Sequence, residues 1–139
     1  MIDKVLEFVA PHLCSGCGEI GTLLCGNCKN DIIKNLFTGC IVCREPNSNG
    51  ICPSHKLSYK RAWVVGLRKG ALQRLIGGFK FQNMKAGAWY LADLLDERLS
   101  PFPPGTLLVP IPTTPAHIRE RGYDHILLIT QYLASKRGL

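Results

Sequence analysis

Apolar residues recur at helical spacing in three stretches of the second half of the chain. The first follows Gly70 and places four of them at i, i+3, i+4 and i+7, namely Leu72, Leu75, Ile76 and Phe79. The second covers residues 85–99 and has Ala88, Leu91, Ala92, Leu95 and Leu99 on its inward face. The third follows Asp124, a residue suited to N-capping, and carries Ile126, Ile129 and Leu133 before Gly138. This period predicts three amphipathic helices.

Two apolar runs without helical spacing predict strands at residues 61–67 and 106–112. The second run is apolar throughout, which is typical of a strand covered on both faces in a parallel sheet. Pro110 and Pro112 cannot donate ladder hydrogen bonds, so we expect the strand to end there. Strands that alternate with helices predict the opening of an α/β domain.

The loop after the second predicted strand is rich in hydroxyl, glycine and basic residues. It carries Thr113, Thr114, His117, Arg119, Arg121 and Gly122. A loop at the carboxyl end of a parallel strand, leading into a helix, is where α/β folds bind anions. The loop is therefore a candidate anion site. The alternative is an exposed turn whose arginines pair with Glu120 or Asp124.

All seven cysteines lie in the first half of the chain and fall into regular pairs with one histidine. The four pairs are Cys14 and Cys17, Cys25 and Cys28, Cys40 and Cys43, and Cys52 and His55. Two ligands three residues apart can point at one ion, and tetrahedral zinc needs two such pairs. Eight ligands predict two zinc sites, both structural, because four protein ligands leave no open position for catalysis.

The sequence leaves two ways of pairing these ligands. Pairing in chain order gives a four-cysteine site and a three-cysteine, one-histidine site, and it is the arrangement we favour. The alternative is a cross-brace in which the first and third pairs share one ion. The segment between the two halves has apolar residues at helical spacing and can separate two consecutive ribbons; they are Ile32, Ile33, Leu36 and Phe37.

Charge divides the chain where the cysteines end. Residues 1–58 carry five basic and five acidic side chains, whereas residues 59–139 carry twelve basic and five acidic ones, which is the whole formal charge of +7. We therefore expect a double zinc ribbon at 1–58 and part of an α/β domain at 59–139. No acidic residue occurs between Glu45 and Asp93, and such a basic stretch suits phosphate on a nucleotide or nucleic acid, unless it is only a solvated face.

Hydropathy argues against a membrane-spanning or secreted protein. No apolar run reaches the ~18–20 residues that cross a bilayer. Residues 1–10 include Asp3 and Glu7 and lack the basic start and cleavage site of a signal peptide. We expect a cytoplasmic protein, in which cysteines serve as metal ligands more often than as disulfides.

Four motifs together resemble the competence protein F (ComF) family. They are the paired cysteines, Phe79-Lys80-Phe81, Val109-Pro-Ile-Pro112 and Arg119-Glu-Arg-Gly-Tyr123. The resemblance covers essentially the whole chain and implies a double zinc ribbon followed by a type I phosphoribosyltransferase domain. It implies that residues 113–122 form the pyrophosphate loop, with Arg119 and Arg121 on the phosphates of phosphoribosyl pyrophosphate and Lys80 as a further contact. It also implies Mg²⁺ with that ligand and a link to natural competence and DNA uptake.

The chain departs from that family in one respect. Type I phosphoribosyltransferases carry a later strand ending in paired acidic residues and a Thr/Gly-rich loop, which hold the ribose and its 5′-phosphate. This sequence has no such motif, since its single adjacent acidic pair, Asp96-Glu97, lies in a predicted helix. We therefore expect an incomplete parallel sheet with an exposed apolar edge, a complementing C-terminal fragment as partner, and no phosphoribosyl transfer by this chain alone.

Two functions from different classes follow, and a third alternative is a structural remnant with a folded zinc module and a poorly stable α/β fragment. The first is a ComF-like protein of the phosphoribosyltransferase family, linked to DNA uptake or nucleotide metabolism, that binds phosphoribosyl pyrophosphate in its intact form. The second is a non-catalytic zinc-ribbon adaptor that binds single-stranded DNA or a competence protein. In the adaptor, Trp63, Trp89 and Tyr90 can stack on bases, although core packing is the simpler reading of these rings.

Overall fold

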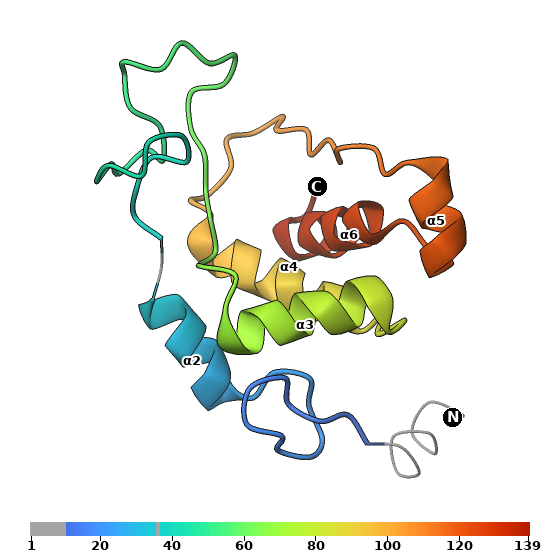
Figure 1. The fold of residues 1–139 in the computed structure, drawn as a ribbon. Coiled ribbons are helices and arrows are strands. Elements are labelled where there is room, and N and C mark those ends of the chain that lie inside the picture. The colour runs from blue at the N-terminus through green and yellow to red at the C-terminus, as the bar shows by residue number, and fades with distance from the viewer. Residues whose placement is uncertain (1–10, 36) are drawn as a thin grey trace.

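The computed structural model describes residues 11–35 and 37–139 (Figure 1). Within these ranges the chain forms five helices and no sheet, and its β contacts are two isolated bridges. The helices are α2 (Gly26–Lys34), α3 (Gly70–Phe81), α4 (Gly87–Arg98), α5 (Pro115–Arg121) and α6 (His125–Arg137). None of them has the length and apolar character needed to cross a bilayer. The predictions made on residues 1–10 and on Leu36 fall outside the described residues.

The three helices predicted from apolar spacing are confirmed as α3, α4 and α6. The Asp124 carboxylate caps α6 by accepting hydrogen bonds from the backbone of Ile126 and Leu127, both at 3.1 Å. Gly138 ends the helix in the left-handed conformation, with a φ of 67°. Local chemistry at both ends therefore fixes where α6 begins and ends.

The segment predicted as an anion-binding loop contains a helix. Thr114 caps α5 and Pro115 occupies its first turn, where a missing N–H costs nothing. Gly122 ends α5 with a φ of 75°. Because α5 and α6 follow each other across this glycine, residues 113–125 form a helical corner rather than an open loop.

The hydrophobic core joins the first cysteine segment to the helices. Its fully buried side chains include Leu23, Leu75, Phe79 and Leu94, all at 1% exposure or less. Arg74 of α3 also donates to the carbonyl oxygens of Ser15 and Gly16, at 2.9 Å for the latter. The division of the chain at residue 58 stays a prediction, but the segment before α2 packs directly on α3 and α4.

One carboxylate ties three helices together. Asp93 of α4 accepts from the ammonium groups of Lys29 on α2 and Lys136 on α6, the latter at 2.5 Å. Burial opposes ionisation of Asp93, but these two ammonium groups outweigh it and hold its pKa below the usual range. The acidic residues of α4 are thus used within the fold, and the Asp96 carboxylate similarly accepts from Arg137 at 2.5 Å.

The predicted parallel sheet does not form in the described part of the chain. Residues 61–67 and 106–112 have no ladder partner, and Figure 1 shows both as irregular segments beside the helices. The second segment was also expected to be covered on both faces, which is wrong for alternate residues: Leu107, Val109 and Ile111 are 81%, 73% and 80% exposed. A strand needs a neighbour to pair with, and the described residues supply none.

Candidate metal centres

The ligand atoms of Cys14, Cys17, Cys25 and Cys28, the first ligand group, all lie within 4.8 Å of one another. The sulfurs of Cys17 and Cys25 are 3.6 Å apart. A disulfide would need about 2.05 Å, whereas tetrahedral zinc with ~2.3 Å bonds spaces its sulfurs about 3.8 Å apart. The spacing is therefore that of ligands around an ion.

A tight turn and a helix start place these four sulfurs. The bridge between Leu13 and Ile20 closes the turn that carries the first pair. Cys25 is the N-cap of α2 and Cys28 lies in its first turn, so both face the preceding loop. The backbone N–H groups of Gly16 and Cys25 donate to the Cys14 sulfur at 3.4 and 3.3 Å, which favours its thiolate form.

The second ligand group consists of Cys40, Cys43, Cys52 and His55, whose ligand atoms also lie within 4.8 Å of one another. The sulfurs of Cys43 and Cys52 are 3.5 Å apart. The hydrogen bonding of the first group recurs here, since two backbone N–H groups donate to the Cys40 sulfur, both at 3.4 Å. His55 Nε2 is buried without a hydrogen-bond partner among the described residues, which a metal bond would satisfy.

Within each group the thiols cannot all ionise unless a cation is present. Burial opposes ionisation of Cys14, but the backbone N–H groups of Cys25, Cys17 and Gly16 outweigh it and lower its pKa to about 6. Burial and the nearby Cys25 sulfur raise the pKa of Cys28 to about 12. The second group shows the same split, with a pKa of about 6 at Cys40 and about 12 at Cys52. A divalent ion bound among the four ligands stabilises the thiolate form of every cysteine in the group.

Two zinc ions fit these two groups in a structural role. The grouping follows chain order rather than the cross-brace. Each group offers four protein ligands, which completes a tetrahedral site and leaves no position for substrate. His12, the remaining histidine of the cysteine-rich half, belongs to neither group and is exposed.

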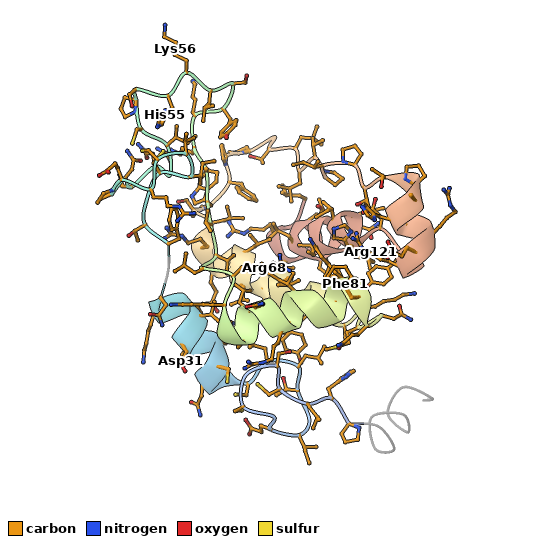
Figure 2. The ribbon with its side chains drawn as sticks, in the orientation of Figure 1. Asp31, His55, Lys56, Arg68, Phe81 and Arg121 are labelled. Carbon is orange, nitrogen blue, oxygen red and sulfur yellow. The ribbon has the colours of Figure 1, made fainter. Side chains whose placement is uncertain are left out.

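The residues predicted to bind pyrophosphate separate into two sets of three, the first being Lys80, Arg119 and Arg121 and the second Thr113, Thr114 and Gly122. Lys80 lines the same cleft as the buried ring of His125, whose Nδ1 lies 3.0 Å from Arg121 Nη1. Figure 2 shows Arg121 beside Phe81, and its guanidinium carbon lies 5.8 Å from that ring centre. Arg119 is exposed, and it makes no ion pair with a described residue.

The other three residues of that prediction hold the corner together. The Thr113 hydroxyl donates to the Asp124 carboxylate at 2.8 Å, which ties the irregular segment to the start of α6. Thr114 accepts the hydrogen bond that caps α5, and Gly122 supplies the left-handed turn between α5 and α6. These contacts hold the corner in place, and a contact of the same three residues with pyrophosphate stays a prediction.

Two residues that fasten this corner to the core, Tyr123 and His125, were not predicted to have this role. The Tyr123 hydroxyl donates to the backbone oxygen of Phe79, and the two rings lie 5.5 Å apart. His125 is 7% exposed and lies 6.2 Å from the Phe79 ring. The sequence signal that could have identified them is their position just after Gly122, which ends α5. The chain reverses direction there, so the side chains that follow turn back toward the fold.

No family model, curated protein or solved structure matches this chain. The support for zinc binding is the geometry of the two ligand groups. The resemblance to the ComF family rests on the sequence motifs alone.

Proposed function

We propose that this is a ComF-type protein that binds a pyrophosphate-bearing ligand, phosphoribosyl pyrophosphate in its intact form, on a scaffold held by two structural zinc ions. The zinc ions supply folding free energy and no chemistry on the ligand. Mg²⁺ accompanies phosphoribosyl pyrophosphate when that ligand is bound, and it neutralises charge on the leaving group. The role in competence and DNA uptake rests on the motif resemblance.

The observation that carries this proposal is that Lys80 lines the same cleft as the buried His125, whose Nδ1 lies 3.0 Å from Arg121 Nη1. These two cations come from segments far apart in sequence, and no described carboxylate forms an ion pair with either one. Asp124, the nearest acid in the chain to His125, is already used by Thr113 and the backbone of α6. Uncompensated positive charge of this kind attracts phosphate.

Pyrophosphate is expected to bind weakly and to lose affinity as salt rises, because the attraction is electrostatic. Lys80→Met should weaken binding by about tenfold, the cost of one charge-assisted contact. Arg119→Ala removes an exposed arginine that makes no ion pair with a described residue, and it tests whether residues 113–122 reach the ligand. Titration calorimetry at two salt concentrations measures both variants, with Lys34→Met on exposed α2 as the control. Equal heats from wild type and Lys80→Met would contradict the proposal.

A second function, binding of single-stranded DNA, is favoured by the linker after the second ligand group. Its two aromatic side chains are exposed, Tyr59 at 49% and Trp63 at 42%. Lys60 and Arg61 lie between them and make no ion pair with a described residue. Exposed rings between cations suit stacked bases and their phosphates.

The two tryptophans give a matched test of DNA binding. Trp89 is as exposed as Trp63, at 45%, but its ring lies 5.1 Å from Tyr90 and 5.7 Å from the Lys136 ammonium, whereas Trp63 has no such aromatic or cation contact among the described residues. Trp63→Ala is expected to weaken binding of an oligothymidine by about tenfold, the worth of one stacked base. Trp89→Ala should leave it unchanged. Fluorescence anisotropy measures both, and equal effects of the two changes would remove the linker from the binding surface.

A further inference from the structure

A cleft of about 250 Å³ lies between α3, α4 and α6, beside the irregular segment at Val65. Figure 1 shows these three helices packed together. The walls of the cleft are apolar and include Val65, Leu72, Ile76, Leu95, Ile126 and Ile129. Two polar side chains, Lys80 and His125, also line it. Apolar walls with a few polar groups are the usual make-up of a small-molecule site.

The contact with Arg121 determines which ring nitrogen of His125 carries the proton. Arg121 Nη1 lies 3.0 Å from Nδ1, and a guanidinium can only donate, so Nδ1 is the acceptor. The neutral ring then carries its proton on Nε2, and burial, reinforced by Arg121 and Lys80, lowers the pKa of His125 and keeps it neutral. Nε2 makes no hydrogen bond to any residue of 11–35 or 37–139, although the side chain is 7% exposed.

Lys80 adds a charge at the same cleft. Its side chain is half-buried, and the ion pairs found in the described chain leave its ammonium without a carboxylate. The cleft therefore presents one cation and one neutral N–H donor among apolar walls. A ligand that satisfies all three features has an apolar body and a single anionic group that accepts hydrogen bonds.

We propose that this cleft binds a small amphipathic carboxylate, with its apolar body between α3, α4 and α6 and its carboxylate on Lys80 Nζ and His125 Nε2. A pyrophosphate is charged along its whole length and gains nothing from the apolar walls. The two ligands share Lys80, whereas the walls belong to the carboxylate site alone. The proposed carboxylate site therefore does not depend on the binding of phosphoribosyl pyrophosphate.

Binding of 2-naphthoate, with neutral 2-naphthamide as the shape-matched control, tests the carboxylate site on the full zinc-loaded chain. We expect saturable binding of the acid, about tenfold tighter than binding of the amide. Lys80→Met should remove that preference. Lys85→Met should keep it, because the Lys85 ammonium lies 5.3 Å over the Tyr123 ring and does not line the cleft. Titration calorimetry and ligand-observed NMR give the affinities.

A change in the cleft wall separates this site from the pyrophosphate contacts. Ile129→Phe narrows the cleft and should weaken both naphthyl probes while leaving pyrophosphate binding unchanged; thermal unfolding confirms that the variant is folded. Absence of saturable binding, equal affinity for acid and amide, or equal losses in Lys80→Met and Lys85→Met would overturn the assignment. So would sedimentation showing that a second copy covers the cleft and prevents naphthoate binding.

Discussion

Replacing Cys17 with serine is expected to unfold much of the helical part of the protein, whereas Cys43→Ser should unfold its own ribbon and leave the helices intact. The two cysteines are equivalent, since each is the exposed second ligand of its group. Structural zinc contributes on the order of 10 kcal/mol to folding, so loss of the first ion should lower the free energy of unfolding by at least about 3 kcal/mol.

The difference comes from what each ribbon touches. The first ribbon places Leu23 and Leu24 in the main core, accepts from Arg74 of α3, and hydrogen-bonds Thr22 to Tyr90 of α4 at 3.0 Å. The second ribbon meets α4 through a hydrogen bond from Arg98 to the backbone oxygen of Phe37, at 3.4 Å. Helical circular dichroism during thermal unfolding measures both variants. Equal losses of helix would contradict the asymmetry.

Gly16→Ala is expected to destabilise the protein by about 2–4 kcal/mol, the range of severe overpacking at a constrained site. A β-carbon at Gly16 would lie 2.2 Å from the Cys28 sulfur and 3.2 Å from Ala71 on α3. The sulfur cannot move aside, because zinc binding fixes its position, and the ribbon cannot move away without leaving α3. The change should therefore cost both the first zinc ion and the contact with the helices.

Gly26→Ala is the matched control for that change. Gly26 lies between Cys25 and Cys28, the second pair of the same ligand group, and a β-carbon there meets no atom within 4 Å. Because Gly26 is the first residue of α2, alanine should change stability by less than about 0.5 kcal/mol, or raise it slightly. Urea unfolding and zinc content compare the two variants. A tolerated Gly16→Ala would show that the first ribbon packs on α3 more loosely than the structure indicates.

The zinc ligands could be predicted from the sequence because their geometry is local. Two ligands three residues apart share one turn, so spacing alone nearly determines which sulfurs meet. The caps of α6 were predictable for the same reason, since Asp124 and Gly138 act on neighbouring backbone groups. The choice between chain-order pairing and the cross-brace needed the structure, because it depends on where α2 places the second pair.

The sheet and the anion loop could not be settled by local patterns. A continuous apolar run such as residues 106–112 shows strand potential, but pairing depends on a neighbour that lies elsewhere in sequence or in another molecule. Likewise, the sequence did not indicate which way the side chains of Arg119 and Arg121, the two arginines of α5, would point. Arg121 lies beside His125 while Arg119 stays exposed, because the left-handed turn at Gly122 brings the last residue of α5 next to the first residue of α6.

The zinc content of the purified protein tests the central claim most directly. Native mass spectrometry of the full chain, prepared without chelators, should show two zinc ions per molecule, and Cys43→Ser should retain one. Thiol titration of the native protein should find the cysteines protected until the metal is removed. A wild-type protein with one zinc ion or none, and seven freely reacting thiols, would contradict the two-site account.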